Sequence, residues 1–591
     1  MATALTDEAS PKARPRRGGR RSPPWWPVVA LPAAAAVIYT VVTRRLTGDL
    51  HYVLGALRTG GAAGYSPSEV FTHRPYFYRW FVAGLDGLTF GPTALRETLM
   101  GAAGAMLAAA AGGALYAALS RRAGGREAAL TAGATGLALA LAPRNDFLQP
   151  EWAAVVLTVV GVAAAIGPDR AWRAALLAAS PLGLAVMMKY STAATAAIGV
   201  LLVYTVDRGR AVRVALVAVP VAAALFGLSV LGGSHEWQWT EDMPRINQSA
   251  LSRTGLHPRF VLDRTVEFLA DRALATPVLL LLPGALLLLL CRVRGRGRRA
   301  ELLLVALAVG LGAQTVVVVQ GNWFLYHAAQ LPVLAAALWG LAVGGARRPP
   351  PWLFGTVSLL YGVLPVLYAT APERYQRPGA VWAAGLLALL AAAVDARREA
   401  RARTSARRGT VGPATTARGP GRGVWPAVLA ALAGVVCLAA SSWPGSPHLV
   451  LDGRVTVTSS AYLAQMRHTE READRLRARI PAGAPVLYLA FGDTTYYVGH
   501  PARCRYPIAT FLQRSRFLPD VAGLTSFREN ADCVDHDPAP YAVLDRAWFR
   551  PGKVDPRLWR RVTAVYDCPR PSPDAGSAVV LCVRRPAPAT S

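Results

Sequence analysis

Acidic residues are scarce in this sequence: its 591 residues include 35 aspartates and glutamates against 64 lysines and arginines, a formal net charge of +29. An excess of this size can indicate a nucleic-acid-binding protein, but such proteins gather basic residues on one module with interleaved aromatic residues. Here the arginines lie instead in the gaps between apolar runs. The charge pattern therefore argues against a nucleic-acid partner.

Cysteine is also rare, with six residues and no C-x-x-C spacing, which argues against a zinc site. Four of the six lie in the C-terminal part, and an even set fits an oxidising exterior. Four cysteines allow three pairings. We prefer one of them, although the sequence does not decide it: Cys504 with Cys533 and Cys568 with Cys582.

What the sequence has in abundance is apolar residues, which make up 53% of the chain. Runs of roughly the ~20 residues that cross ~30 Å of hydrocarbon as a helix recur from residue 26 to residue 441, and we count about thirteen of them. This pattern predicts an all-α polytopic membrane protein. A signal peptide is the alternative for the first run, but no convincing A-x-A cleavage site follows it.

Basic loops orient the chain, because short loops rich in lysine and arginine stay on the cytoplasmic side. The basic tail at residues 1–25 is therefore expected inside, as are the basic loops at 121–127, 168–173, 207–213, 291–301, 346–351 and 395–409. The membrane part is residues 26–441, with outward loops at 44–93, 144–151 and 320–330. Residues 174–206 contain Lys189, and we split them into two spans that meet there. A single span would reverse the predicted side of the membrane for every later loop.

The C-terminal part, residues 442–591, has no further spanning run and is predicted to be a small extracytoplasmic α/β domain. An amphipathic pattern over residues 460–480 predicts a helix, and residues 486–491, 541–545 and 578–585 have the pattern of strands. The length is within the usual range for one domain.

The first outward loop carries polar residues that an ordinary connection does not need. Asp49, His51 and Tyr52 follow the first span closely in the stretch TGDLHYV, and Arg74 and Arg79 lie later in the loop. A long ordered loop usually has a function. Anchoring at lipid headgroups is an equally good reading of Arg79, whereas Asp49 gains nothing from a membrane interface.

The remaining candidates lie at other outward turns. Asp146 and Glu151 stand at the start of a span, where simple helix capping is an equal alternative. Lys189, followed by Tyr190, lies between two apolar runs and must snorkel or find an anionic partner such as phosphate. The turn QGNWFLYH contributes three more candidates, for which turn geometry and a satisfied bundle-facing histidine are the alternatives: Asn322, Tyr326 and His327.

These motifs, in this order and on one side of the membrane, resemble those of the GT-C glycosyltransferases. GDLHYV is similar to the D-L-x-x-Y of the polyprenyl-phosphomannose-using branch, RNDFLQPE to a short acidic turn, MMKYS to a lysine between adjoining spans, and QGNWFLYH to the bacterial Q-x-K-x-F-x-Y-H pattern. Two departures are clear. Asn322 replaces a common lysine, and no D-D or D-x-D follows the first span, which argues against a metal-dependent pyrophosphate donor.

The resemblance implies a plasma-membrane hexosyl- or pentosyltransferase that moves a sugar from a polyprenyl-phosphate donor to an extracytoplasmic glycan, lipid or protein, with inversion and no metal or other cofactor. It makes Asp49 the general base. Lys189, His327 and Arg74 or Arg79 would hold phosphate, and the other candidates would bind substrate. A transporter or flippase for a lipid-linked saccharide and a non-catalytic membrane scaffold are the alternatives. Donor sugar, acceptor, pathway and oligomeric state are not encoded in recognisable form.

Overall fold

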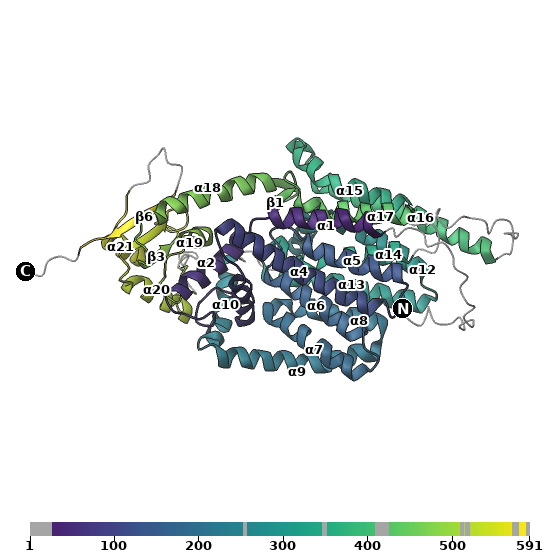
Figure 1. Cartoon of the computed structure of the whole chain (residues 1–591), viewed down its shortest axis with the longest axis horizontal. Coiled ribbons are helices and arrows are strands. Elements are labelled where there is room, and N and C mark those ends of the chain that lie inside the picture. The colour runs from purple at the N-terminus through teal and green to yellow at the C-terminus, as the bar shows by residue number, and fades with distance from the viewer. Residues whose placement is uncertain are drawn as a thin grey trace, which may run out of the picture.

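The protein is described by a computed structural model that covers residues 26–251, 257–345, 352–407, 425–508, 513, 521–569 and 578–586 (Figure 1). The predicted basic tail at residues 1–25 and the basic loop at 346–351 lie outside the described residues. Helices form the long first part of the chain, and a small mixed sheet with helices forms the last part, as the sequence predicts.

Every predicted apolar run within these residues forms a helix. These helices are α1 (Trp26–Thr43), α4 (Thr93–Leu119), α5 (Gly125–Ala140), α6 (Pro150–Ile166), α7 (Ala171–Met188), α8 (Ala193–Val206), α9 (Arg208–Gly232), α12 (Leu282–Arg292), α13 (Arg296–Gln320), α14 (Gln330–Gly344), α15 (Trp352–Thr370), α16 (Pro378–Arg407) and α17 (Trp425–Ala439). Within the described ranges, six are long and apolar enough to cross a membrane alone, or up to eight if two bent pairs each count as one span. The chain is a multi-pass membrane protein.

The break predicted at Lys189 is present. Helix α7 ends at Met188, Lys189 has an extended backbone (φ −164°, ψ 128°), and a short 3₁₀ turn, η2 (Tyr190–Thr192), leads into α8. The break interrupts the helical hydrogen bonding at Lys189, whose ammonium group reaches Glu151 at 2.6 Å. Two helices, not one, therefore occupy residues 171–206.

The predicted outward loops contain helices of their own. The first loop folds into α2 (Gly48–Ala62), bent by 57° from α1, and α3 (Tyr76–Gly87), which begins directly after Pro75. The segment between α9 and α12 also forms two helices, α10 (Glu236–Leu251) and α11 (Pro258–Ala275). The turn at residues 320–330 contains the short η4 (Leu325–Ala328) after Gly321, whose φ of 68° suits glycine.

The C-terminal domain begins with a hairpin of β1 (Pro447–Leu451) and β2 (Arg454–Thr458), followed by α18 (Ser459–Arg477), which Thr458 caps. Its sheet has the order β3-β4-β6-β5, with β3 (Val486–Leu489) parallel to β4 (Tyr541–Asp545), and β6 (Val579–Arg584) antiparallel to both β4 and β5 (Tyr566–Asp567). Helices α19 (Gly492–Val498), α20 (Thr525–His536) and α21 (Pro556–Val565) complete it.

The two preferred disulfides are both present in this domain: Cys504 with Cys533, and Cys568 with Cys582. The domain lies at one end of the elongated molecule, and α2 and α10 lie between it and the helical bundle (Figure 1). Helix α2 packs directly on α19, and α10 packs on α20. Residues of the loop at 44–93, which is predicted to face outward, are therefore held between the helical bundle and the C-terminal domain.

Candidate active site

Polar side chains from four predicted outward turns meet where the helical bundle faces this junction. Asp49 lies in the first turn of α2, where a carboxylate is favoured by the helix dipole. Its side chain is 36% exposed, and its Oδ2 lies 3.9 Å from Nη2 of the buried Arg74. Tyr326, from η4, also interacts with this carboxylate. Asp49 is thus a solvent-accessible carboxylate next to a fixed cation.

A second group lies beside the first and is more deeply buried. Lys189 Nζ donates to Glu151 Oε1 at 2.6 Å and lies 3.3 Å from His327 Nε2. His327 Nε2 is 3.6 Å from the same Glu151 oxygen. Burial lowers the pKa of the Lys189 ammonium group, and the neighbouring carboxylate of Glu151 opposes that shift. The sequence places these three residues far apart, and the fold brings them together.

The combined cluster is electrically balanced, with two carboxylates, Asp49 and Glu151, facing two cations, Arg74 and Lys189. Charges removed from water need such balance. Some hydrogen-bonding groups of the cluster are unsatisfied: among the described residues, Glu151 Oε2 and His327 Nδ1 have no hydrogen-bond partner, and neither has Asn322 Oδ1 in the turn that carries His327. A polar ligand that reached this cluster would therefore meet both cations and unsatisfied groups.

Three of the predicted site residues have partners outside the cluster. The Arg79 side chain is 1% exposed and bonds the carbonyls of Pro67 and Arg74 and, at 2.7 Å, the carboxylate of Glu236. Asp146 is bonded by both terminal nitrogens of the buried Arg272. Tyr190 lies against Thr240. These contacts hold the loops that surround the cluster.

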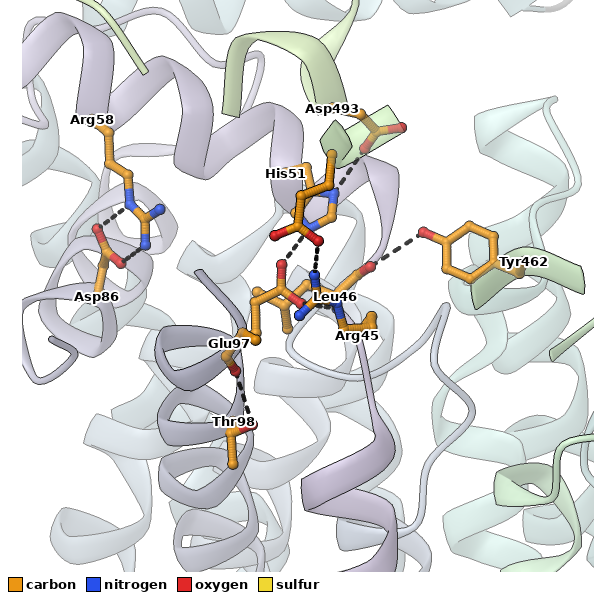
Figure 2. Close-up of polar contacts among 11 residues, drawn as sticks. Arg45, Leu46, His51, Arg58, Asp86, Glu97, Thr98, Tyr462 and Asp493 are labelled. Carbon is orange, nitrogen blue, oxygen red and sulfur yellow. Dashed lines mark hydrogen bonds and ion pairs between the residues drawn. The ribbon is translucent and has the colours of Figure 1, made fainter. Parts of the chain in front are cut away.

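His51 points toward Glu97 of α4 and Asp493 of the C-terminal domain, whereas Tyr52, one turn after Asp49 in α2, lies close enough to Arg74 and Asp49 for their charges to act on its hydroxyl. Figure 2 shows His51 between Glu97 of α4 and Asp493 of α19, with ring nitrogens 3.1 and 2.8 Å from the two carboxylates. The ring of Tyr52 lies 4.5 Å from that of His73 and 5.7 Å from that of Phe491. These residues join α2 to its neighbours.

Three residues that the sequence analysis did not select prove important to this region. His73 precedes Arg74 with a φ of 43°, and burial holds the pKa of its imidazole well below the usual value. His73 could have been found from the sequence, because it directly precedes the selected Arg74 in the stretch THRP. Glu97 and Asp493 gave no local signal, since their partner His51 is 46 and 442 residues away in sequence.

Comparison with models of protein families finds no match, and no curated protein matches by sequence. The fold is similar to two crystal structures of ArnT from Cupriavidus metallidurans, in the apo state (15% identity) and bound to undecaprenyl phosphate (16%). Each has a TM-score of 0.49 and covers 94% of this chain and 97% of that one. Arabinosyltransferase EmbB from Mycobacterium smegmatis matches at 18% identity and a TM-score of 0.38, over 73% of this chain and 42% of that one. The identities are below 25% and the TM-scores are below 0.5, so these likenesses carry no argument about activity. Any activity has to be argued from the residues of the site.

Proposed function

We propose that this protein is a membrane glycosyltransferase that moves a sugar from a polyprenyl-phosphate donor to an extracytoplasmic acceptor, with the site and residues 442–591 on the outer side of the plasma membrane. The observation that supports it is the cluster of Asp49, Arg74, Glu151, Lys189 and His327 at the ends of apolar helices. A lipid phosphate would reach such a position with its chain still in the membrane.

The reaction needs few groups, and the cluster supplies them. Asp49 takes the proton of the acceptor hydroxyl, whose oxygen attacks the anomeric carbon of the donor sugar. The bond from that carbon to the phosphate oxygen breaks, and the polyprenyl phosphate leaves with the electron pair. Arg74 and Lys189 stabilise the charge that builds on phosphate. One displacement at the anomeric carbon inverts its configuration.

The roles of the two carboxylates differ because their surroundings differ. Asp49 is partly exposed and has one cation at 3.9 Å, so an acceptor hydroxyl can approach it. Glu151 is buried, and its bond to Lys189 Nζ keeps that ammonium group in place. Asp49 is therefore the base in this proposal, and Glu151 orients the lysine that would contact phosphate.

The test is Asp49→Asn, which preserves shape and hydrogen bonding but removes the basic oxygen. Transfer from a panel of polyprenyl-phosphate sugars should fall by ~10²-fold or more, while binding of undecaprenyl phosphate, a sugar-free probe, should change little. Asp474→Asn, on the exposed face of α18, is the matched control and should transfer at the normal rate. A folded Asp49→Asn variant that transfers sugar at an undiminished chemical rate would rule out this base.

A further inference from the structure

His51 is enclosed between two acidic residues from different parts of the molecule. Its side chain is fully buried, with Nε2 at 3.1 Å from Glu97 in the membrane part and Nδ1 at 2.8 Å from Asp493 in the C-terminal domain (Figure 2). An ionised carboxylate only accepts hydrogen bonds, so this arrangement is complete when both ring nitrogens donate. The ring of Tyr496 stacks on His51 at 4.3 Å. The imidazole is therefore fixed on several sides.

Other contacts reinforce the same junction. Arg45, between α1 and α2, pairs with Glu97 at 3.2 Å and with Glu470 of α18 at 2.5 Å. The hydroxyl of Tyr462, also in α18, donates to the carbonyl of Leu46. The C-terminal domain thus holds both the connection into α2 and the first turns of α2.

The backbones of α2 and α19 also approach closely, and glycine makes this possible. A β-carbon at Gly492 would lie 2.5 Å from the α-carbon of Tyr52, and one at Gly55 would lie 2.8 Å from the nitrogen of Tyr496. No other residue type fits at such a distance without displacement of one helix. Asp493, directly after Gly492, reaches His51 because of this close approach.

We propose that Asp493, acting through His51, is a positioning residue of the C-terminal domain that fixes the orientation of α2 and with it the carboxylate of Asp49. The proposal rests on the assignment of Asp49 as the base. Asp49 and His51 are two residues apart, so their side chains leave the helix about 200° from each other. The contacts of His51 with Glu97 and Asp493, called the clasp below, lie on one side of α2. They therefore set the direction of the Asp49 carboxylate on the other side.

Small displacements of this helix matter for a reaction that depends on alignment. A misplacement of about 1 Å can reduce a rate by on the order of 100-fold. Helix α2 is only 15 residues long and is bent from α1, so its first turn depends on outside contacts for a fixed orientation. The C-terminal domain thereby contributes to the site through the orientation that it gives to α2.

The test compares Asp493→Asn with Asp493→Glu in the full-length protein. Asn removes the charge that holds His51, and we expect kcat to fall about tenfold or more while KM for the polyprenyl-phosphate sugar changes less than about twofold. Glu keeps the charge and should restore most of the rate. In a His51→Gln background, the Asn substitution should have little further effect, because the clasp is already open. Glu472→Gln, in an exposed pair with Arg475, is the matched control and should leave kcat unchanged.

A second measurement does not depend on activity. Amide hydrogen exchange of α2 should increase in Asp493→Asn and remain unchanged in Glu472→Gln, because only the first variant loosens the helix. Three results would each overturn the positioning role: unchanged exchange in α2, an unchanged kcat, or a rise in KM as large as the fall in kcat. Absence of sugar transfer by the wild-type protein would contradict the proposed function instead, and hydrogen exchange would still decide whether the clasp holds α2.

Discussion

Lys189 and Glu151 depend on each other, because each would be a buried and uncompensated charge without its partner. The glutamate side chain is 1% exposed and the lysine side chain 17% exposed, with 2.6 Å between Nζ and Oε1. Removing one member of a buried pair costs about 3 kcal/mol or more, whereas removing both can be nearly neutral. Stability and ligand binding can therefore be separated at this pair.

We predict that Lys189→Met alone lowers both the thermal stability and the affinity for undecaprenyl phosphate, since it removes a phosphate cation and leaves Glu151 unpaired. The double variant Lys189→Met/Glu151→Gln should regain stability without regaining affinity. Thermal unfolding in detergent and binding of the lipid phosphate measure the two effects. If the double variant binds the lipid as well as the wild type does, Lys189 has only a structural role.

At the residue scale, the sequence could indicate groups that stand where apolar runs end. Asp49 and Lys189 could be selected from the sequence, because a charged residue at the end of a membrane span is costly unless it has a function or a partner. The pairing of Arg79 with Glu236, 157 residues later, was not visible, and this contact satisfies a side chain that otherwise resembles a phosphate ligand. Long-range partners decide whether such an arginine is available, and one sequence does not contain that information.

At the scale of elements, α2 and α19 form the contact on which the junction depends. We predict that Gly492→Ala lowers the unfolding midpoint, because its new β-carbon would lie 2.5 Å from the Tyr52 α-carbon and must push the helices apart. Overpacking of this kind costs about 1–3 kcal/mol. Gly61→Ala, in α2 but with no atom within 4 Å of its added β-carbon, is the control and should be neutral or slightly stabilising. Equal midpoints for the two variants would contradict the close packing.

Element prediction succeeded where the local pattern is strong. Strands β3, β4 and β6 are short apolar runs between polar turns, and α18 has a regular amphipathic pattern, so all four were expected. The hairpin of β1 and β2 was missed although its signal is present in the sequence: Asp452 and Gly453, with φ of 54° and 77°, form a two-residue hairpin turn, and Val455 and Val457 alternate with polar residues. Asp271 of α11 also accepts hydrogen bonds from the backbone nitrogens of Asp452 and Gly453 at this turn. Helix α2 was also missed, because it is stabilised by packing on α19.

At the scale of the whole molecule, the proposal requires the cluster and the C-terminal domain to lie on the side opposite the basic loop at residues 291–301. Two positions can report this: Arg475, on the exposed face of α18, and Arg294, in the basic loop. The background carries Cys291→Ser and Cys437→Ser, which remove the two cysteines that are not in disulfides and leave both disulfides.

We predict that an impermeant thiol reagent labels Arg475→Cys in intact cells and labels Arg294→Cys only after the membrane is made permeable. The physical reason is the retention of arginine-rich short loops on the cytoplasmic side. The unmodified background protein controls for labelling elsewhere, and detergent-solubilised samples confirm that both positions react when accessible. Labelling of Arg294→Cys in intact cells, together with protection of Arg475→Cys, would place Asp49 inside. An extracytoplasmic acceptor could then not reach it, so the predicted topology and the proposed reaction would both be wrong.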